Sequence, residues 1–242
     1  MAFKISGILP PQGIRARSTK SVLRFDTKPT LSGTSYVGEP VTLIGGEFHN
    51  ATLLSRKWLI DGQEFTQDGQ TFTPGQVGSL TCEVTIQRDT DQVTAIAGPL
   101  DIEVNPQTNL VYQCGFEYNE WVGTSSGAGF GYPDSSRSGQ SCALLSIQTS
   151  MNPIMAIKGF ETGGQYVLEL YIANGLHFTN YIQISSQDSD LNWSQSQNTS
   201  SKIWNYYSID FTMTSETFFP TIAHLGGTGT IFVDDLKITK IG

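Results

Sequence analysis

Three carboxylates in the second half of the chain could hold a hard cation. Glu117 ends an apolar run that begins at Asn109, and Asp234 with Asp235 interrupts another apolar run near the C-terminus. Ca²⁺ binds carboxylate and carbonyl oxygens in a flexible shell. If the two runs pair as strands, a calcium ion at Glu117, Asp234 and Asp235 would tie them together, and we expect a structural calcium site there.

The adjacent aspartates also pose a packing problem. The apolar residues around them alternate as in a half-buried strand, at Ile231, Val233, Leu236 and Ile238. Neighbouring residues of a strand point to opposite faces, so one carboxylate is directed toward the packed side, where an unpaired charge is costly. A bound cation, an arginine partner or a β-bulge would resolve the conflict. The alternative is a charged edge strand that discourages pairing with other chains.

Aromatic rings are the second candidate chemistry, because the C–H faces of sugars can stack on them. The candidates for glycan binding are Tyr132, Tyr171, Phe178, Tyr181, Trp193 and Tyr207. Trp193 is the foremost, since the polar residues around it, Asp190, Asn192, Ser194 and Gln195, predict a loop that does not bury it. Ordinary packing is the alternative for each ring, and Trp121 and Trp204 are expected in the core.

No cluster of residues predicts catalysis. Residues 123–127 match the Gly-x-Ser-x-Gly pattern of esterases, but a nucleophile elbow needs a following helix, and glycine, proline and serine follow here. His49, His177 and His224 stand apart from other metal ligands, which argues against a transition-metal site. Carboxylates for glycoside hydrolysis could come from Glu117, Glu161, Glu169 and Asp210, although nothing local marks one as an acid. We expect a protein that is not an enzyme.

The elements that carry these residues are predicted to be strands. No window shows the 3.6-residue period of a helix, whereas short apolar runs alternate with turns rich in Gly, Ser and Thr. The chain lacks both a long apolar run and an apolar signal segment at its start, so we expect no membrane span and synthesis in a cytosol. Cys82, Cys114 and Cys142 are an odd number, which argues against a disulfide framework, although a Cys114–Cys142 bridge stays open.

Charge is distributed unevenly along the chain. The net charge is −8, yet residues 1–28 hold six of the 14 basic residues and one of the 22 acidic ones, so the remainder carries −13. Residues 1–28 lack an amphipathic period and predict an extended arm with basic positions Lys4, Arg15, Arg17, Lys20, Arg24 and Lys28. The arm would anchor on an acidic protein surface, and a disordered tail is the alternative. Without a dense Lys/Arg block it does not predict nucleic-acid binding.

Four segments after residue 108 share the pattern of one known family. They are Gly-Phe-Glu at 115–117, a candidate core strand at 164–172, a Trp-aromatic-Phe-Thr strand at 204–212 and the Asp-Asp strand at 230–238. Residues 108–242 thereby resemble the jelly-roll carbohydrate-binding modules of the family 4/9 type. The resemblance implies glycan binding and a structural calcium ion held by Glu117 and by Asp234 or Asp235.

Residues 29–104 predict a separate sandwich. Trp58 lies on one candidate strand, and a Leu-x-Cys-x-Val pattern around Cys82 lies on a later one. This order resembles the bacterial and phage immunoglobulin-like repeat. Leu43 stands where antibody domains would place the partner cysteine, so Trp58 is expected to pack on a free Cys82. Residues 105–107 are the expected linker to the second domain.

The sequence therefore predicts an all-β chain with an extended N-terminal arm, an immunoglobulin-like β-sandwich and a jelly-roll β-sandwich. This order resembles accessory proteins on the surface of tailed-phage virions, which are made in the host bacterial cytoplasm. We expect a non-enzymatic capsid decoration or head-fibre protein that the arm anchors to the major capsid protein or another virion protein lattice. A glycan partner, no nucleic acid, no membrane and a homotrimer are expected. The alternatives are a tail-associated adhesin, a free carbohydrate-binding protein and a hydrolase fragment.

Overall fold

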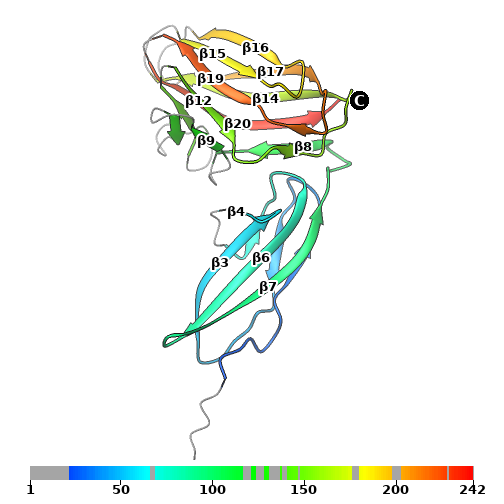
Figure 1. The fold of residues 1–242 in the computed structure, drawn as a ribbon, viewed down its shortest axis with the longest axis vertical. Helices are drawn as coiled ribbons and strands as arrows, with labels where there is room; N and C mark the ends of the chain where they lie inside the picture. Colours follow the sequence, from blue (N-terminus) through cyan, green and yellow to red (C-terminus); the bar gives the residue numbers. More distant parts are fainter. Residues whose placement is uncertain are drawn as a thin grey trace, which may run out of the picture.

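Every regular element in the described part of the chain is a strand. The computed structural model describes residues 22–65, 69–116, 121–123, 128–130, 137, 141–146, 148–175, 180–197, 203–227 and 229–241. The strands form two β-sandwiches stacked end to end (Figure 1). The predicted fold class, all-β with an immunoglobulin-like and a jelly-roll sandwich, is confirmed. Over these ranges no helix is long and apolar enough to cross a membrane.

The first sandwich packs a three-stranded sheet on a four-stranded one. The first sheet has the order β1-β2-β5, with β1 (Thr30–Gly33), β2 (Val41–Ile44) and β5 (Thr71–Phe72). The second has the order β4-β3-β6-β7, with β3 (Thr52–Ile60), β4 (Gln63–Phe65), β6 (Gly78–Arg88) and β7 (Asp91–Ile102).

Trp58 is at the centre of the first core. Its ring stacks on that of Phe72, with centroids 5.3 Å apart, and it lies opposite Cys82 in the register of β3 and β6. Cys82 is free and buried, and burial raises the pKa of its thiol to about 11. Leu43 is part of the same core. The predicted packing of Trp58 with a free Cys82 is confirmed.

The end of the predicted arm belongs to the first sandwich. Leu23 is buried, Phe25 packs against the first core, and the N–H of Asp26 donates to the carbonyl of Glu47 at 2.7 Å. The prediction of an extended arm to residue 28 is therefore wrong for residues 22–28, because Leu23 is buried and Phe25 is partly buried against the first core. Arg24 and Lys28 are exposed on this segment, whereas Lys4, Arg15, Arg17 and Lys20 lie outside the described residues.

The second sandwich packs a six-stranded sheet on a five-stranded one. The six-stranded sheet has the order β10-β11-β20-β14-β17 with β8 also on β20, and consists of β8 (Leu110–Cys114), β10 (Ala128–Phe130), β11 (Ala143–Leu145), β14 (Gln165–Asn174), β17 (Asn205–Thr212) and β20 (Ile231–Lys240). The five-stranded sheet has the order β16-β15-β19-β12-β9, with β9 (Trp121–Gly123), β12 (Thr149–Pro153), β15 (Asn180–Ser185), β16 (Asn192–Gln197) and β19 (Thr221–Gly226). A two-stranded ladder, β13 (Ile157–Lys158) and β18 (Thr217–Phe218), lies beside them.

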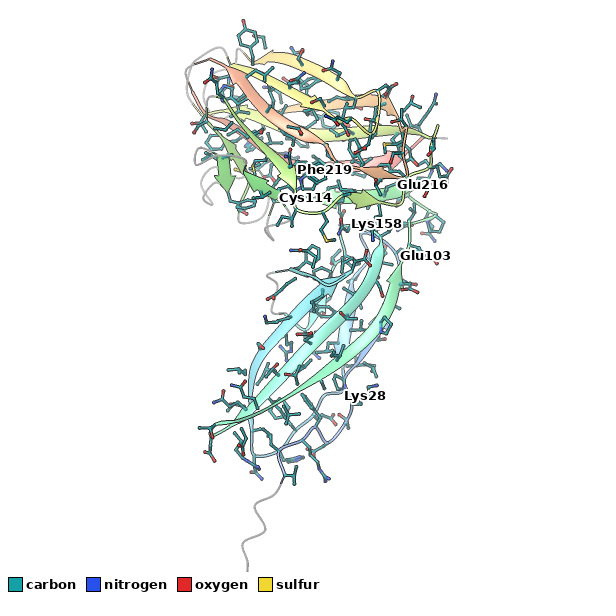
Figure 2. The ribbon with its side chains drawn as sticks, in the orientation of Figure 1. Lys28, Glu103, Cys114, Lys158, Glu216 and Phe219 are labelled. Atoms are coloured by element: carbon teal, nitrogen blue, oxygen red, sulfur yellow. The ribbon has the colours of Figure 1, made fainter. Side chains whose placement is uncertain are left out.

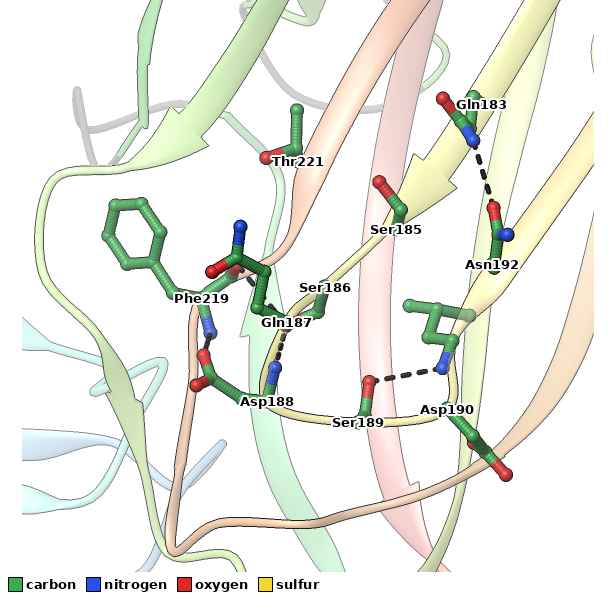
Figure 3. Close-up of a pocket in the computed structure, with 11 residues that line it drawn as sticks. Gln183, Ser185, Ser186, Gln187, Asp188, Ser189, Asp190, Asn192, Phe219 and Thr221 are labelled. Atoms are coloured by element: carbon green, nitrogen blue, oxygen red, sulfur yellow. Dashed lines mark hydrogen bonds between the residues drawn. The ribbon is translucent and has the colours of Figure 1, made fainter.

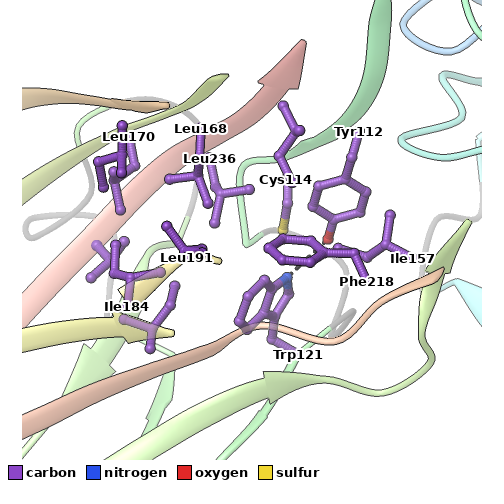
Figure 4. Close-up of a cluster of buried hydrophobic side chains, with 14 of the residues drawn as sticks. Tyr112, Cys114, Trp121, Ile157, Leu168, Leu170, Ile184, Leu191, Phe218 and Leu236 are labelled. Atoms are coloured by element: carbon purple, nitrogen blue, oxygen red, sulfur yellow. Dashed lines mark hydrogen bonds between the residues drawn. The ribbon is translucent and has the colours of Figure 1, made fainter. Parts of the chain in front are cut away.

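The alternation along β14 shows how the second core forms. The alternate residues Tyr166, Leu168, Leu170 and Ile172 are fully buried. Val167, Glu169 and Tyr171, which lie between them, are partly exposed. Burying each aliphatic side chain stabilises the fold by about 1.5–3 kcal/mol. Within this core the indole N–H of Trp121 donates to the hydroxyl of Tyr112 at 2.9 Å (Figure 4). The predicted core strand 164–172 is confirmed as β14.

β20 lies inside the six-stranded sheet. It pairs with β8, where Leu236 faces Cys114, and with β14 on its other side. The predicted pairing of the first and last strands of this domain is confirmed, and the four predicted apolar positions, Ile231, Val233, Leu236 and Ile238, are buried. Because β20 has neighbours on both sides, the alternative of a charged edge strand is wrong.

The bridge that the sequence left open between Cys114 and Cys142 is not formed. Both cysteines are free and buried. Cys114 lies in the core between the sheets, whereas Cys142 packs with Ala173 and Phe232 in a separate cluster on the outer side of the six-stranded sheet. The sheet itself therefore separates the two thiols.

Polar contacts join the two sandwiches. The Lys158 ammonium pairs with the Asp61 carboxylate, which also accepts the N–H of Ser79 at 2.9 Å. Lys158 lies where the sandwiches meet (Figure 2). The hydrogen bond from Lys158 holds the pKa of Asp61 below its ordinary value. The N–H of Gln113 also donates to the carbonyl of Gly75 across the junction at 2.9 Å.

The predicted linker, 105–107, lies in a turn between the sandwiches. Asn105 and Leu110 form an isolated β-bridge that closes this turn. The side chain of Leu110, the first residue of β8, is buried in the first core. The turn is thus held by both sandwiches.

Candidate functional site

The outer face of the five-stranded sheet carries no charged side chain among its described strand residues. Ile182, Ile184 and Ile222 point into the core, so the residues between them face outward. We call the outward residues the neutral face: Val122, Ser150, Asn152, Tyr181, Gln183, Ser185, Asn192, Ser194, Ser196, Thr221, Ala223 and Leu225. Hydroxyl and carboxamide groups dominate this surface.

Strand register places the polar groups of the neutral face side by side. Ser185 lies between Asn192 on β16 and Thr221 on β19. The amide nitrogen of Gln183 donates to the Asn192 Oδ1 at 2.9 Å. The hydroxyls of Ser185 and Thr221 form no hydrogen bond with another residue in the described ranges, so they are available to a ligand.

A pocket of about 630 Å³ opens where β15 ends on the neutral face. It lies between the β15–β16 loop, residues 186–191, and Phe219, with Gln183, Ser185 and Thr221 on its floor (Figure 3). Both hydrogen-bonding side chains and an aromatic ring line it. This combination can hold a small polar ligand by one apolar contact and several directional hydrogen bonds.

Hydrogen bonds brace the loop at the rim of the pocket. The Asp188 Oδ2 accepts the N–H of Phe219 at 3.0 Å, and the Asp188 carbonyl accepts the N–H of Thr214 at 2.8 Å. Asp190 accepts the N–H of Thr212 at 2.6 Å through its Oδ1. A wall that is fixed before a ligand arrives loses less conformational entropy on binding. The pocket is therefore preorganised.

The aromatic wall comes from a pair of adjacent phenylalanines. Phe218 is fully buried and stacks on Phe211, with ring centroids 5.0 Å apart. Phe219, the next residue, is 39% exposed and lies beside the pocket (Figure 3). Because neighbouring residues of an extended chain point to opposite sides, burying Phe218 directs Phe219 outward.

The outer face of the six-stranded sheet has a different composition. We call its polar residues the charged face: Arg137, Glu169, Tyr171, Tyr206, Asp210, Asp234, Asp235 and Lys237. Lys237 and Glu169 approach within 3.7 Å, and the Tyr206 hydroxyl donates to Glu169. That hydrogen bond raises the pKa of Tyr206 above its ordinary value. Lys237 and Glu169 are thus paired within the protein.

The two aspartates of β20 lie at a β-bulge. The register with β14 shifts between Glu169 and Tyr171, so that two residues of β20 stand opposite Leu170. Asp235 has a φ of 50°, in the left-handed region. The expected bulge is therefore present, and it turns both carboxylates away from the core between the sheets.

Arg137 supplies the expected arginine partner. The Asp234 side chain is fully buried, and its Oδ2 accepts the N–H of Arg137 at 2.8 Å. The other oxygen, Oδ1, accepts the N–H of Asp235 at 2.9 Å, and the Asp235 carboxylate forms an ion pair with the Arg137 guanidinium. Two of the three solutions expected for this strand, a bulge and an arginine, are thus combined.

The calcium site stays a prediction. Glu117 lies outside the described residues, and the described residues include no group of three or more His, Cys, Asp or Glu side chains that could hold a metal ion. Asp234 and Asp235 are brought together as expected, but with Arg137 as a partner.

The predicted sugar-binding rings lie in different places. The Arg137 guanidinium lies 3.5 Å from the centre of the Tyr171 ring and covers one of its faces. Tyr181 is 52% exposed on the neutral face. Tyr132 and Phe178 lie outside the described residues.

Trp193 and Tyr207 pack together at the edge of the sandwich. Their ring centroids are 5.1 Å apart, and both rings pack against the core. The expectation of an exposed loop around Trp193 is wrong, because Trp193 lies in β16 with its side chain on the inner face. Trp121 is buried as expected, whereas Trp204 packs half-buried against the outer cluster of Cys142. A glycan-binding role for Trp193 and Tyr207 stays a prediction.

Sequence reasoning missed Gln183, Asn192, Phe219 and Arg137. One usable signal was the run of alternating Ile with Gln and Ser in 180–185, which places uncharged polar groups on one face. The Phe-Phe pair was another, since one ring of such a pair must face outward. Arg137 has no local signal, because its partners are almost a hundred residues later in the chain.

No protein family matches the chain, and no curated protein is similar to it in sequence. Several solved structures with a similar fold are carbohydrate-binding modules. The C-terminal family 22 module of Clostridium thermocellum Xyn10B has a TM-score of 0.43 and 11% identity, over 55% of this chain and 94% of that one. The C-terminal family 6 module of LamC from Zobellia galactanivorans has a TM-score of 0.39 and 13% identity, over 53% and 99%. The adhesin domain K3 of Lys-gingipain from Porphyromonas gingivalis has a TM-score of 0.41 and 12% identity, over 54% of this chain and 97% of that one. With TM-scores below 0.5, these similarities assign neither a ligand nor a binding residue to this chain.

Proposed function

We propose that the second sandwich binds a glycan at the pocket beside Phe219 and catalyses no reaction. The observation that carries this proposal is the meeting of an exposed ring, outward hydroxyls and a braced loop in one pocket. A sugar presents hydroxyl groups around an apolar C–H face, so it complements a pocket that offers one ring and several hydrogen-bonding groups.

The two carboxylates at the rim support a binding role. Glycosidases direct a pair of carboxyl groups at the scissile bond, one as an acid and one as a base or nucleophile. Here Asp188 accepts the N–H of Phe219 and Asp190 accepts the N–H of Thr212. These carboxylates hold the loop in place, which is a structural task.

The proposal is tested by calorimetric titration of the full chain with soluble xylan, galactan, laminarin and mannan. Phe219→Ala is expected to weaken binding about tenfold, or about 1.4 kcal/mol. Tyr206→Ala is the matched control, since Tyr206 is 50% exposed on the charged face. Loss of binding in Tyr206→Ala alone would move the site to the charged face. Binding to none of the polysaccharides would overturn the proposal.

We also propose, as a second role, that the chain is displayed on a tailed-phage virion. The excess of basic residues in 1–28 and the end-to-end sandwiches support this role. Because Phe25 and Asp26 contact the first sandwich, a deletion that tests the anchor and spares this sandwich should stop at residue 21. Cosedimentation with particles of the phage whose genome encodes the chain should be lost in the deletion. Equal sedimentation of both proteins would contradict the anchoring role, and analytical ultracentrifugation tests the predicted homotrimer.

A further inference from the structure

The charge of the pocket restricts the ligands that it can take. Among the described residues, the pocket and the neutral face hold no lysine or arginine, and the ionised groups at the rim are the carboxylates of Asp188 and Asp190. An anionic sugar would meet two like charges here without a compensating cation. Placing like charges together opposes binding, and it is a common basis of specificity.

The hydrogen-bonding groups match an uncharged ligand. A serine or threonine hydroxyl both donates and accepts, and a glutamine or asparagine carboxamide carries both functions. Ser185, Thr221, Gln183 and Asn192 therefore match sugar hydroxyls, which also donate and accept. A carboxylate or sulfate accepts only and would leave the acceptor atoms of these side chains unpaired.

The outward residues of the neutral face are aligned along one strand. Tyr181, Gln183 and Ser185 face outward at every second position of β15, and the pocket with Phe219 lies beyond Ser185. At about 3.3 Å per residue, Tyr181 and Ser185 are about 13 Å apart along the strand. A single sugar ring cannot touch both Tyr181 and Phe219.

Small residues keep this path open. Gln183 is flanked by Ser194 on β16 and by Ala223 on β19. Neither side chain is large enough to divide the surface between Tyr181 and the pocket. The two exposed rings thus bound one continuous uncharged strip.

We infer that the ligand is an uncharged glycan chain that lies along β15, with one sugar in the pocket against Phe219 and a later sugar against Tyr181. This inference rests on the proposed function and adds the charge class and the extent of the ligand. Tyr181 is therefore a second contact that only a chain of several sugars reaches.

Charge is tested with pairs of polymers that share a backbone. The full chain is titrated with hydroxyethylcellulose and carboxymethylcellulose, and with hydroxyethyl and carboxymethyl derivatives of xylan and galactan, at low and high salt. The hydroxyethyl form controls for added bulk. We expect the carboxymethyl form to bind about tenfold more weakly at low salt, and the difference to shrink at high salt. Equal or tighter binding of the carboxymethyl form would overturn the inference and leave glycan binding intact. No binding to any backbone in either form, together with no binding to the unmodified polysaccharides named above, would overturn the proposed function itself.

Length is tested with the disaccharide and the hexasaccharide of the backbone that binds. Tyr181→Ala should weaken hexasaccharide binding about tenfold and leave disaccharide binding unchanged, whereas Phe219→Ala should weaken both. Tyr206→Ala should affect neither, and urea unfolding of each variant checks that the fold is intact. Unchanged hexasaccharide affinity in Tyr181→Ala would show that the ligand does not reach along β15.

Discussion

The two outer faces of the second sandwich have the same construction and opposite chemistry. On both, alternate strand residues point away from the core between the sheets, but one face carries charged residues and the other serine, threonine and carboxamides. On the charged face, Arg137 forms an ion pair with Asp235, and Lys237 forms one with Glu169. On the neutral face, the Ser185 and Thr221 hydroxyls have no partner among the described residues.

The difference indicates that the two faces of one sandwich have different roles. Ionised groups that leave bulk water need partners, since an uncompensated charge destabilises the protein by several kcal/mol. Asp234 meets this need with backbone donors. Uncharged hydroxyls on an open surface stay solvated at little cost and can exchange water for a ligand. The charged face should therefore govern stability, and the neutral face binding.

The largest expected effect is on the charged face. Asp234→Ala should lower the free energy of unfolding by about 2 kcal/mol, because the N–H groups of Arg137 and Asp235 lose their buried acceptor. Urea unfolding followed by tryptophan fluorescence measures this. Ser185→Ala on the neutral face is the control, with an expected change within about 0.5 kcal/mol. Equal stability of the two variants would remove the proposed contrast.

A substitution on the neutral face should weaken glycan binding and leave stability almost unchanged. Gln183→Ala removes a hydrogen-bonding group from the floor of the pocket and should weaken glycan binding about fivefold, or about 1 kcal/mol. Its unfolding free energy should change by no more than about 0.5 kcal/mol. Calorimetric titration and urea unfolding of the same preparation give both values. A stability loss without a binding loss would place Gln183 among the structural residues.

The two faces should also differ in their response to salt, although this effect is smaller than those of the substitutions. The Debye length falls from about 10 Å at 0.1 M to about 3 Å at 1 M salt, which weakens exposed ion pairs. Affinity for an uncharged polysaccharide should change by less than about twofold over this range, since the neutral face offers no ion pair to screen. Titration at both salt concentrations tests this, and a large loss of affinity at high salt would point to the charged face.

The smallest effect concerns the titration of Tyr206. The hydrogen bond to Glu169 raises the pKa of Tyr206, so its stabilisation is complete below the ordinary tyrosine pKa of about 10 and is lost as the pH rises through the raised value. Glu169→Gln should return this pKa toward the ordinary value. The tyrosinate absorbance, measured as a difference from Tyr206→Phe, follows this single group. An unchanged titration would show that the hydrogen bond does not form in solution.

Much of the fold could be predicted because it depends on local alternation. The period of two in 164–172 and around Ile231 and Val233 dictates which side of each strand is buried. The Trp58 and Cys82 pair could be predicted in the same way. The end of the arm could not be predicted, because Leu23 and Phe25 lie in a basic segment. Only the burial of Leu23 and the packing of Phe25 against the first core show where the arm ends.

The binding site was harder to predict because exposure depends on distant partners. Trp193 has polar neighbours in sequence, yet Tyr207 from the other sheet packs on it. Phe219 follows a buried Phe218, and its N–H is bound by Asp188, thirty-one residues earlier. Local patterns in a single sequence do not reveal contacts between residues that are distant in the chain.

The sequence by itself determined the class of fold, the alternation of each strand and the conflict posed by two adjacent aspartates. Those features arise from steric periodicity and from the cost of burying charge, and both act on neighbouring residues. The tertiary structure decided how the conflict was solved, by Arg137 and a bulge, and which polar groups were left for a ligand. It decided these because pairing and burial are set by residues that meet only after the chain has folded.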